Sequence, residues 1–263
     1  MNAVAPRPGT LLLVPNTLDL GTWSGPDEAP DLRSVLPQAV IETAAGLGHW
    51  VCENAKSTRA MLKRIGALVP LSQPLQALDL KELPRPPKGA RAATDDGAML
   101  DALLAPALAG HDLGLVSEAG LPGVADPGAA LVARAHRRGI PVRALSGPSS
   151  ITLALAASGL NGQSFAFVGY VPQDSAALAQ RLRELEQVSR KLAQTQVLIE
   201  TPYRNAALWQ ALLAGLSPAT QLSVSCGLTL EGGFSRTDTV ARWRTAPPID
   251  WPAQRPAVFL LLA

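Results

Sequence analysis

A glycine-rich loop near the middle of the chain is the first place where the residue types could do chemistry. Residues 117–128 read Ser-Glu-Ala-Gly-Leu-Pro-Gly-Val-Ala-Asp-Pro-Gly, so the loop carries the carboxylates of Glu118 and Asp126. Its glycines and prolines let the backbone approach a ligand closely and then hold one shape. A helix N-terminus after the loop would suit an anion, but two carboxylates argue against a polyphosphate and favour a ligand with a positive group. The alternative interpretation is a tight strand-to-helix turn in which Asp126 only caps the helix.

A second candidate loop, Gly147-Pro148-Ser149-Ser150, places two hydroxyls at the start of a helix. Helix capping alone would explain one of them, so a purely structural role for either serine stays open. Both loops follow short apolar runs that predict buried strands. Ligands of open α/β sheets bind outside the carboxyl ends of the strands. The candidate sites are therefore the loops after Val14, Val116, Leu145 and Glu200.

Other familiar chemistry is missing from the sequence. It contains no phosphate-binding Walker loop, no nucleophile elbow and no zinc-protease motif. His49, His111 and His136 are isolated, and none has a partner at metal-ligand spacing, so we predict no metal site. Cys52 and Cys226 form no CxxC pair, and we expect both to be buried, reduced thiols, as in a cytoplasmic protein.

The elements that must position these loops are short apolar runs alternating with helical patterns. The predicted strands are 11–14, 50–51, 113–116, 142–145, 165–170, 197–200, 222–226, 234–239 and 258–262. The predicted helices are about 32–45, 57–65, 94–109, 127–138, 151–159, 174–194 and 204–213, and Ser57, Thr94 and Asp126 are their clearest N-cap candidates. The last strands have little helix between them, which indicates antiparallel pairing. Two α/β units with a hinge near Gly147 follow from this pattern.

Composition sets wide limits on the function. The chain of 263 residues is 47% hydrophobic and has 23 basic and 21 acidic residues, a net charge of +2 that neither demands nor excludes a nucleic-acid partner. No apolar run reaches the roughly 20 residues that span a bilayer, and no leader pattern is visible, so we expect no membrane contact. A connector over 80–91 carries Lys81, Arg85, Lys88 and Arg91 against Glu82. It could contact RNA phosphates, or it is a solvated surface loop.

Taken together, residues 117–128 and 147–159 resemble the tetrapyrrole methylase superfamily of S-adenosylmethionine-dependent methyltransferases. Within it, the chain is most similar to the branch that contains the small-subunit ribosomal RNA cytidine 2′-O-methyltransferase. That branch has an S-[DE]-A-G-x-P loop followed by DPG and then a GP turn, and all of these occur here in the same order and spacing. Its E-D-T-R-x-[ST] stretch is matched by residues 53–59, and its Y-E-[SA]-[PT]-[HY]-R stretch by residues 199–204.

The resemblance implies an α/β fold of two domains, a mainly parallel N-terminal one over 1–147 and a mixed-sheet C-terminal one over 148–263. It also implies S-adenosylmethionine in the cleft between them, and a homodimer. The residues that it assigns to the donor are Pro15, Leu121, Pro122, Gly123, Val124, Ser149, Ser150, Ile151, Ile199 and Leu228. If the acceptor is a hydroxyl, the candidate bases are Glu118, Glu53 and Glu200, in that order. The candidates for binding the acceptor are Arg59, Tyr203 and Arg204, although Arg59 could instead pair with Glu53 at the start of one helix.

The chain departs from the family pattern where the acceptor is expected to approach. The family's T-P-x-G-N-L loop is here Val-Pro-Asn-Thr-Leu-Asp-Leu over 14–20, without its glycine, and Asn54 replaces an acidic residue. Three hypotheses remain open: methyl transfer to RNA, methyl transfer to a tetrapyrrole or another small metabolite, and a donor-binding protein without turnover.

Overall fold

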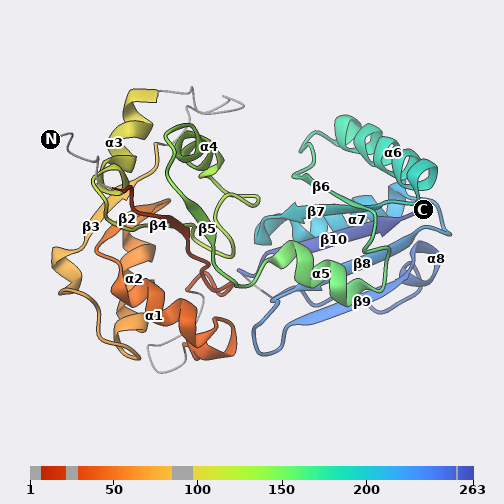
Figure 1. The fold of residues 1–263 in the computed structure, drawn as a ribbon. Helices are drawn as coiled ribbons and strands as arrows, with labels where there is room; N and C mark the ends of the chain where they lie inside the picture. The colour runs from red at the N-terminus through yellow and green to blue at the C-terminus, as the bar shows by residue number, and fades with distance from the viewer. Residues whose placement is uncertain (1–6, 22–28, 85–96, 253) are drawn as a thin grey trace, which may run out of the picture. The chain divides into compact units, whose positions relative to one another are not determined.

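The computed structural model describes residues 7–21, 29–84, 97–252 and 254–263, and the chain divides into two compact units, Met1–Pro148 and Ser149–Ala263 (Figure 1). The boundary lies one residue beyond the expected one. Within the described residues, the first unit holds a five-stranded sheet in the order β3-β2-β4-β1-β5, in which all pairs are parallel. Its strands are β1 (Leu11–Leu13), β2 (His49–Cys52), β3 (Asp79–Glu82), β4 (Leu113–Val116) and β5 (Val142–Ala144). The expectation of a mainly parallel N-terminal sheet is confirmed.

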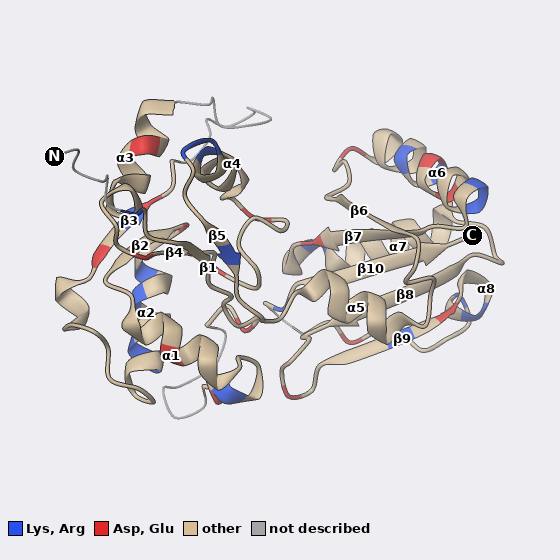
Figure 2. Cartoon of the chain, in the orientation of Figure 1, with Lys and Arg blue, Asp and Glu red and all other residues tan. Residues whose placement is uncertain are grey.

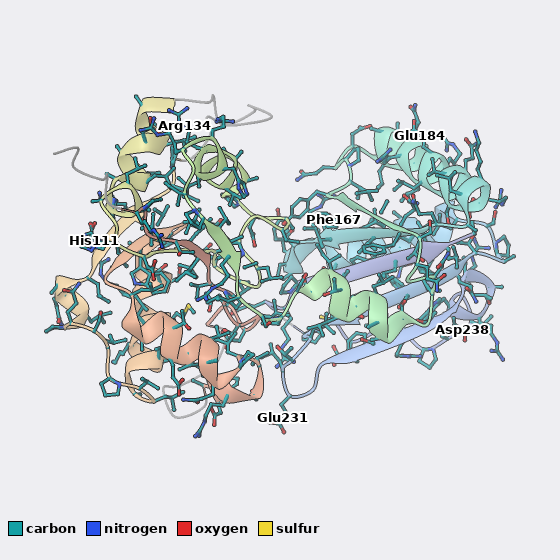
Figure 3. The ribbon with its side chains drawn as sticks, viewed as in Figure 1. His111, Arg134, Phe167, Glu184, Glu231 and Asp238 are labelled. Atoms are coloured by element: carbon teal, nitrogen blue, oxygen red, sulfur yellow. The ribbon has the colours of Figure 1, made fainter. Side chains whose placement is uncertain are left out.

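Helices cover both faces of this sheet, because successive strand residues point to opposite sides. Leu12 packs with the helices α1 (Gln38–Gly46) and α2 (Ala55–Gly66) in one core, whereas Leu11 packs with α3 (Gly97–Leu108) and α4 (Ala129–Arg137) in the other. Short 3-10 helices, η2 (Leu32–Ser34) and η3 (Leu75–Ala77), complete this unit. Arg134 of α4 reaches α3, where its Nη2 lies 2.5 Å from Oδ2 of Asp101 (Figure 3).

Several predicted boundaries in the first unit were wrong for identifiable reasons. The helix expected over 32–45 is broken, because Pro37 ends one turn and starts α1 as its N-cap residue. The helix expected to start at Ser57 begins at Ala55, because the Asn54 side chain accepts hydrogen bonds from the amides of Lys56 and Ser57.

The connector and the central helix also differ from expectation. Residues 80–82, expected in a connector, form part of the edge strand β3, whose Leu80 packs against the core. Its basic residues Arg85, Lys88 and Arg91 lie outside the described residues, as does the expected cap at Thr94. Asp126 does not cap α4, because Gly128 occupies the N-cap position with a φ of +126° that favours glycine.

The second unit holds a mixed sheet in the order β6-β7-β10-β8-β9 within the described residues. Its strands are β6 (Phe165–Gly169), β7 (Thr195–Glu200), β8 (Gln221–Cys226), β9 (Phe234–Thr239) and β10 (Ala257–Leu262). Only β6 and β7 pair in parallel, and the other pairs are antiparallel, which confirms the predicted antiparallel ending. Its helices are α5 (Ser150–Ser158), α6 (Ser175–Leu192), η4 (Pro202–Arg204), α7 (Asn205–Gly215) and α8 (Val240–Trp243).

The two faces of the mixed sheet are covered differently. The helices α6 and α7 pack on one face around Trp209, which stacks edge-on against Trp243 at 4.9 Å. Glu184 lies on the exposed side of α6 (Figure 3). The other face is covered by α5, which has no charged residue, in contrast to α6 (Figure 2). No helix among the described residues is both long enough and apolar enough to cross a bilayer.

Candidate functional site

The carboxyl edge of the parallel sheet brings two of the three candidate bases together. Glu53 follows β2, and its amide donates to the carbonyl of Val116 at 3.2 Å. Glu118 follows β4, and its amide donates to Oε2 of Glu53 at 3.2 Å. The two strands are neighbours in the sheet, so their following loops must meet at this edge. The Glu53 side chain therefore helps to fix the backbone of Glu118.

Asp126 joins this pair as a third carboxylate. Burial, followed by the negative charges of Glu53 and Glu118, raises the pKa of Asp126 to about 7. The Asp126 side chain is therefore half protonated near neutral pH and can hold or release a proton beside the two candidate bases. The concentration of negative potential favours a cationic ligand at this edge.

Replacing Asp126 by asparagine should change how stability depends on pH. The folded-state pKa of about 7 lies above the unfolded value of 3.8, so the folded protein binds the proton more tightly. The stabilisation by the neutral carboxyl is complete below about pH 4 and is lost as the pH rises through 7. We expect Asp126→Asn to match the wild type at pH 4 and to exceed its free energy of unfolding by about 1 to 3 kcal/mol at pH 8, after allowance for partial solvent screening.

Urea unfolding of both proteins from pH 4 to pH 8 measures this difference. Asp250→Asn, at an exposed carboxyl in the second unit, serves as the control and should follow the wild type at every pH. A wild-type stability that stays level with Asp126→Asn over the whole range would contradict the raised pKa.

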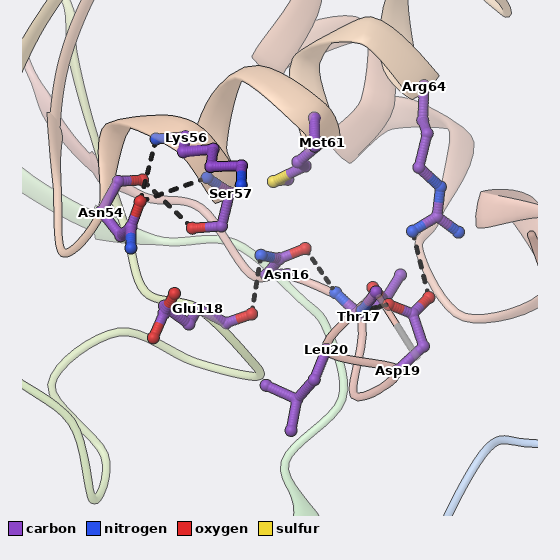
Figure 4. Close-up of a pocket in the computed structure, with 12 residues that line it drawn as sticks. Asn16, Thr17, Asp19, Leu20, Asn54, Lys56, Ser57, Met61, Arg64 and Glu118 are labelled. Atoms are coloured by element: carbon purple, nitrogen blue, oxygen red, sulfur yellow. Dashed lines mark hydrogen bonds and ion pairs between the residues drawn. The ribbon is translucent and has the colours of Figure 1, made fainter. Parts of the chain in front are cut away.

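An open pocket of about 590 Å³ lies beside the carboxylates (Figure 4). It is lined by the loop after β1, by one side of α2 with the residue before it, and by Glu118; its lining residues include Asn16, Leu20, Asn54, Lys56, Met61 and Arg64. Arg64 is held by an ion pair with Asp19, with an N to O distance of 3.0 Å, and by a hydrogen bond to the carbonyl of Pro30. The volume of the pocket lies in the range of pockets that bind small ligands.

The expected donor loops approach one another closely in the first unit. A Cβ atom on Gly147 would lie 2.2 Å from Cβ of Pro15, so the two loops touch at a point where only glycine fits. Gly123 has a φ of +79°, and a Cβ there would meet no atom closer than 3.9 Å, which leaves its backbone open. Val124 is exposed, whereas Leu121 and Pro122 are partly or fully buried in the same loop.

The remaining expected site residues lie in the second unit. Ser149 occupies the N-cap position of α5, but its side chain makes no capping hydrogen bond, and Ser150 and Ile151 form the first turn. Ile199 and Leu228 are partly buried and pack against the core under α5. Tyr203 is 80% exposed.

Glu200 has a structural partner in the second unit. Its side chain is buried, and Oε2 lies 3.2 Å from a guanidinium nitrogen of Arg204, while Oε1 accepts hydrogen bonds from the amide and hydroxyl of Thr201. The same contacts hold Arg204, an expected acceptor ligand. Removing one partner of a buried ion pair leaves the charge of the other partner uncompensated.

Glu200→Gln should therefore lower the free energy of unfolding by about 1 to 3 kcal/mol, because Arg204 loses its counter-charge. Glu184→Gln is a matched control, since Glu184 is exposed and pairs with Arg181 at 3.4 Å, and it should change stability by less than about 0.5 kcal/mol. Chemical denaturation of the two variants compares them. Equal stabilities would contradict the structural role of Glu200.

Some residues fall outside the expected arrangement. Arg59 is exposed and donates to the carbonyl of Ala55, and the described structure shows no ion pair between it and Glu53. The prediction that the histidines are isolated was wrong for two of them, because the rings of His49 and His111 lie 5.3 Å apart and His49 contacts Asp79 at 3.2 Å. His49 starts β2, and His111 lies just before β4, which is the neighbouring strand in the sheet. The two rings therefore meet although they are distant in sequence.

The described residues contain no group of three or more histidine, cysteine or acidic side chains placed to hold a metal ion. Cys52 and Cys226 are buried free thiols, as expected, and burial raises the pKa of both. Asn16 and Lys56 were not predicted as parts of the site, because a single amide or lysine side chain has no spacing signature in the sequence.

Comparisons with known proteins agree with this architecture. Residues 30–241 match the family of tetrapyrrole (corrin/porphyrin) methylases. The ribosomal RNA small subunit methyltransferase I of Vibrio cholerae is 34% identical over 147 residues, 56% of this chain and 48% of that protein. The protein of the same name from Mesorhizobium japonicum is 30% identical over 200 residues, 76% of this chain and 61% of that protein.

The chain thus spans about half to three fifths of the length of these curated relatives. Among solved structures, the methyltransferase CobJ has a similar fold, with a TM-score of 0.55, 17% sequence identity, and coverage of 96% of this chain and 93% of that one. The family match covers most of the chain and includes both units, and the fold agrees with it. The chain belongs to the tetrapyrrole (corrin/porphyrin) methylase family.

Proposed function

We propose that this protein is an S-adenosylmethionine-dependent methyltransferase. The observation that carries the proposal is the edge of the parallel sheet, where Glu118, one of three interacting carboxylates, lines an open pocket of about 590 Å³. Family membership and the names of the relatives, which are methyltransferases, support it. The donor supplies a methyl group on a positively charged sulfonium, which suits the carboxylates of Glu53, Glu118 and Asp126.

The residues of the first unit that we propose for the donor are Pro15, Leu121, Pro122, Gly123 and Val124. The open backbone at Gly123 supports this assignment, because adenosine and amino-acid groups are often held by backbone hydrogen bonds. From the second unit, the resemblance adds Ser149, Ser150, Ile151, Ile199 and Leu228. The chain's contribution to methyl transfer is mainly positioning, since holding reactants in line can account for several kcal/mol of the barrier.

Binding of S-adenosylhomocysteine, the demethylated product of the donor, tests this step by titration calorimetry. We expect saturable binding to the full chain. Gly123→Val, which adds bulk at a position with φ of +79°, should weaken it, whereas Gly162→Val, where a Cβ meets no atom within 4 Å, should not. Failure of the wild type to bind would refute the proposal.

The charge balance of the pocket favours a nucleoside of RNA as the acceptor over a tetrapyrrole that carries several carboxylates. The lining holds two basic residues, Lys56 and Arg64, and two acidic ones, Asp19 and Glu118, and Arg64 already pairs with Asp19. Such a lining offers little free positive charge for a polycarboxylate. It offers hydrogen-bonding amides and an apolar wall of Met61 and Leu20 for a sugar and a base. Both relatives compared above are named as ribosomal RNA methyltransferases.

In this proposal, Glu118 accepts the proton of the acceptor hydroxyl, since an alcohol is almost fully protonated at neutral pH. Glu53 holds the Glu118 backbone and serves as the second candidate. Arg59, Tyr203 and Arg204 are proposed contacts of the RNA. Mass spectrometry of small-subunit ribosomal RNA from a strain that lacks this gene tests the acceptor: one methylated nucleotide should disappear and should return on complementation. An unchanged modification pattern would exclude ribosomal RNA and leave the small-metabolite alternative.

We also propose a homodimer in the reducing cytoplasm. The charge-free helix α5 supports self-association, because its Leu153 is exposed, as are Phe165 and Phe167 on β6. The two free thiols support the compartment. Sedimentation equilibrium should give twice the chain mass, and Leu153→Arg should shift it to the monomer. A monomeric wild type would refute the dimer.

A further inference from the structure

Asn16 makes an unusual number of contacts for one loop residue. It is 6% exposed, and its side-chain Nδ2 donates to two carbonyls, those of Ser117 at 3.1 Å and Glu118 at 3.0 Å. Its Oδ1 accepts from the amide of Thr17 at 2.9 Å. Its backbone exchanges two hydrogen bonds with Gly120, at 2.9 and 3.2 Å, which form an isolated antiparallel bridge. One residue thus joins the loop after β1 to the loop after β4 (Figure 4).

The chemistry of the amide makes asparagine specific at this position. Both Nδ2 hydrogens are used on carbonyl acceptors, and the oxygen is used on an amide donor, so the side chain can face only one way. An aspartate of the same shape would place a carboxylate oxygen against two carbonyl oxygens. Serine or alanine would leave the buried carbonyl of Ser117 and the partly buried carbonyl of Glu118 without this donor.

The loop that Asn16 holds is the one that carries the proposed base. The carbonyls of Ser117 and Glu118 accept hydrogen bonds from the Asn16 side chain, and the amide of Glu118 donates to the Glu53 carboxylate. The backbone of Glu118 is therefore fixed by two side chains from the two flanking loops. Gly120, two residues further on, starts the segment that leads to Gly123 and Val124.

We infer that Asn16 is a positioning residue that sets the conformation of residues 117–124 for donor binding and orients Glu118 for methyl transfer. This inference rests on the proposed function. In this chain Thr17 stands where the family pattern has its glycine, and the Asn16 side chain next to it joins the loop after β1 to the loop after β4.

The sharpest test is Asn16→Asp, which keeps the shape and removes the donors. Asn161→Asp is the matched control, because the Asn161 Nδ2 also donates to a carbonyl, that of Ala193, but in a loop of the second unit. Two readings are made on the full chain: hydrogen exchange of the peptide that contains residues 117–124, and calorimetric affinity for S-adenosylhomocysteine. We expect Asn16→Asp to speed exchange in that peptide and to weaken the affinity about tenfold or more at pH 8. Asn161→Asp should change neither.

Lowering the pH should restore the affinity of Asn16→Asp for S-adenosylhomocysteine, which a general loss of structure would not allow. When protonated, the new carboxyl can donate one of the two lost hydrogen bonds, so the variant's affinity relative to wild type should recover between pH 8 and pH 5.5. The carboxylates of Glu53, Glu118 and Asp126 are present in both proteins, and the ratio removes their common effect. If Asn16→Asp fails to fold, Asn16→Ala removes the donors without adding a charge; it is compared by hydrogen exchange and affinity, and it should show no recovery on acidification.

Wild-type exchange and wild-type affinity in the Asn16 variants would overturn the inference. Faster exchange with unchanged affinity would also overturn it, because the loop would then be disordered without consequence for the donor. If the wild type binds no S-adenosylhomocysteine, the proposed function fails, and the exchange measurement still decides whether Asn16 holds the loop.

Discussion

Gly147→Ala should lower the free energy of unfolding more than alanine at any other glycine in the loops after β4 and β5. The new Cβ would lie 2.2 and 2.3 Å from Cβ and Cγ of Pro15, distances that real Cβ atoms do not show. Pro15 cannot turn away, because its ring is rigid and the residue is buried. One of the two loops must therefore move. We expect a loss of about 3 kcal/mol in the free energy of unfolding, at the upper end for an overpacked site, together with weaker binding of S-adenosylhomocysteine.

Gly46→Ala is the control for this substitution. Gly46 ends α1 in the same unit, and a Cβ there would meet no atom within 4 Å. Alanine is a better helix former than glycine, so the control should be as stable as the wild type or slightly more stable. Urea unfolding of both variants gives the comparison. A Gly147→Ala protein with wild-type stability would show that the loops after β1 and β5 do not touch as described.

Glu118→Gln should give the largest loss of activity. The glutamine keeps the size of the side chain and cannot accept the proton of an acceptor hydroxyl, so methyl transfer to RNA should fall by about 100-fold or more. Binding of S-adenosylhomocysteine should change little, because the backbone contacts of residue 118 to Asn16 and Glu53 do not involve its side chain. The measurement is the rate of transfer at saturating donor.

Glu42→Gln controls for the loss of one negative charge. Glu42 is exposed on α1, where its Oε1 accepts a hydrogen bond from Gln38, outside the proposed site. Its transfer rate should equal that of the wild type. If Glu118→Gln also retains the wild-type rate, Glu118 is not the base, and Glu53→Gln becomes the next variant to test. Loss of activity only in Glu53→Gln would reverse the order of the two candidates.

The sequence predicted the fold well where apolar runs are continuous. The Leu113–Val116 run is buried on both faces of a parallel sheet, and such a strand has no alternating pattern to misread. The helix starts were less predictable, because capping depends on backbone angles. Gly128 at φ +126° displaced Asp126 from the N-cap position, although an Asp-Pro pair is a common helix start.

The candidate site could be predicted only in part. The loop over 117–128 was found because its glycines, prolines and carboxylates are adjacent in sequence. The bond between Glu118 and Glu53 joins residues 65 positions apart, and Asn16 bonds to carbonyls about 100 positions away. Such contacts depend on strand order, which places β4 between β1 and β2, and strand order has no local signature. The pairing of His49 with His111 escaped prediction for the same reason.

The most direct test of the proposed activity is methyl transfer from labelled S-adenosylmethionine to small ribosomal subunits purified from a strain that lacks this gene. We expect label in one nucleotide of the RNA with the wild-type protein, and at least about 100-fold slower labelling with Glu118→Gln. Subunits from the complemented strain should take up no label, because their site is already methylated. Binding of S-adenosylhomocysteine with no label transferred to the RNA would contradict the proposed methylation of ribosomal RNA.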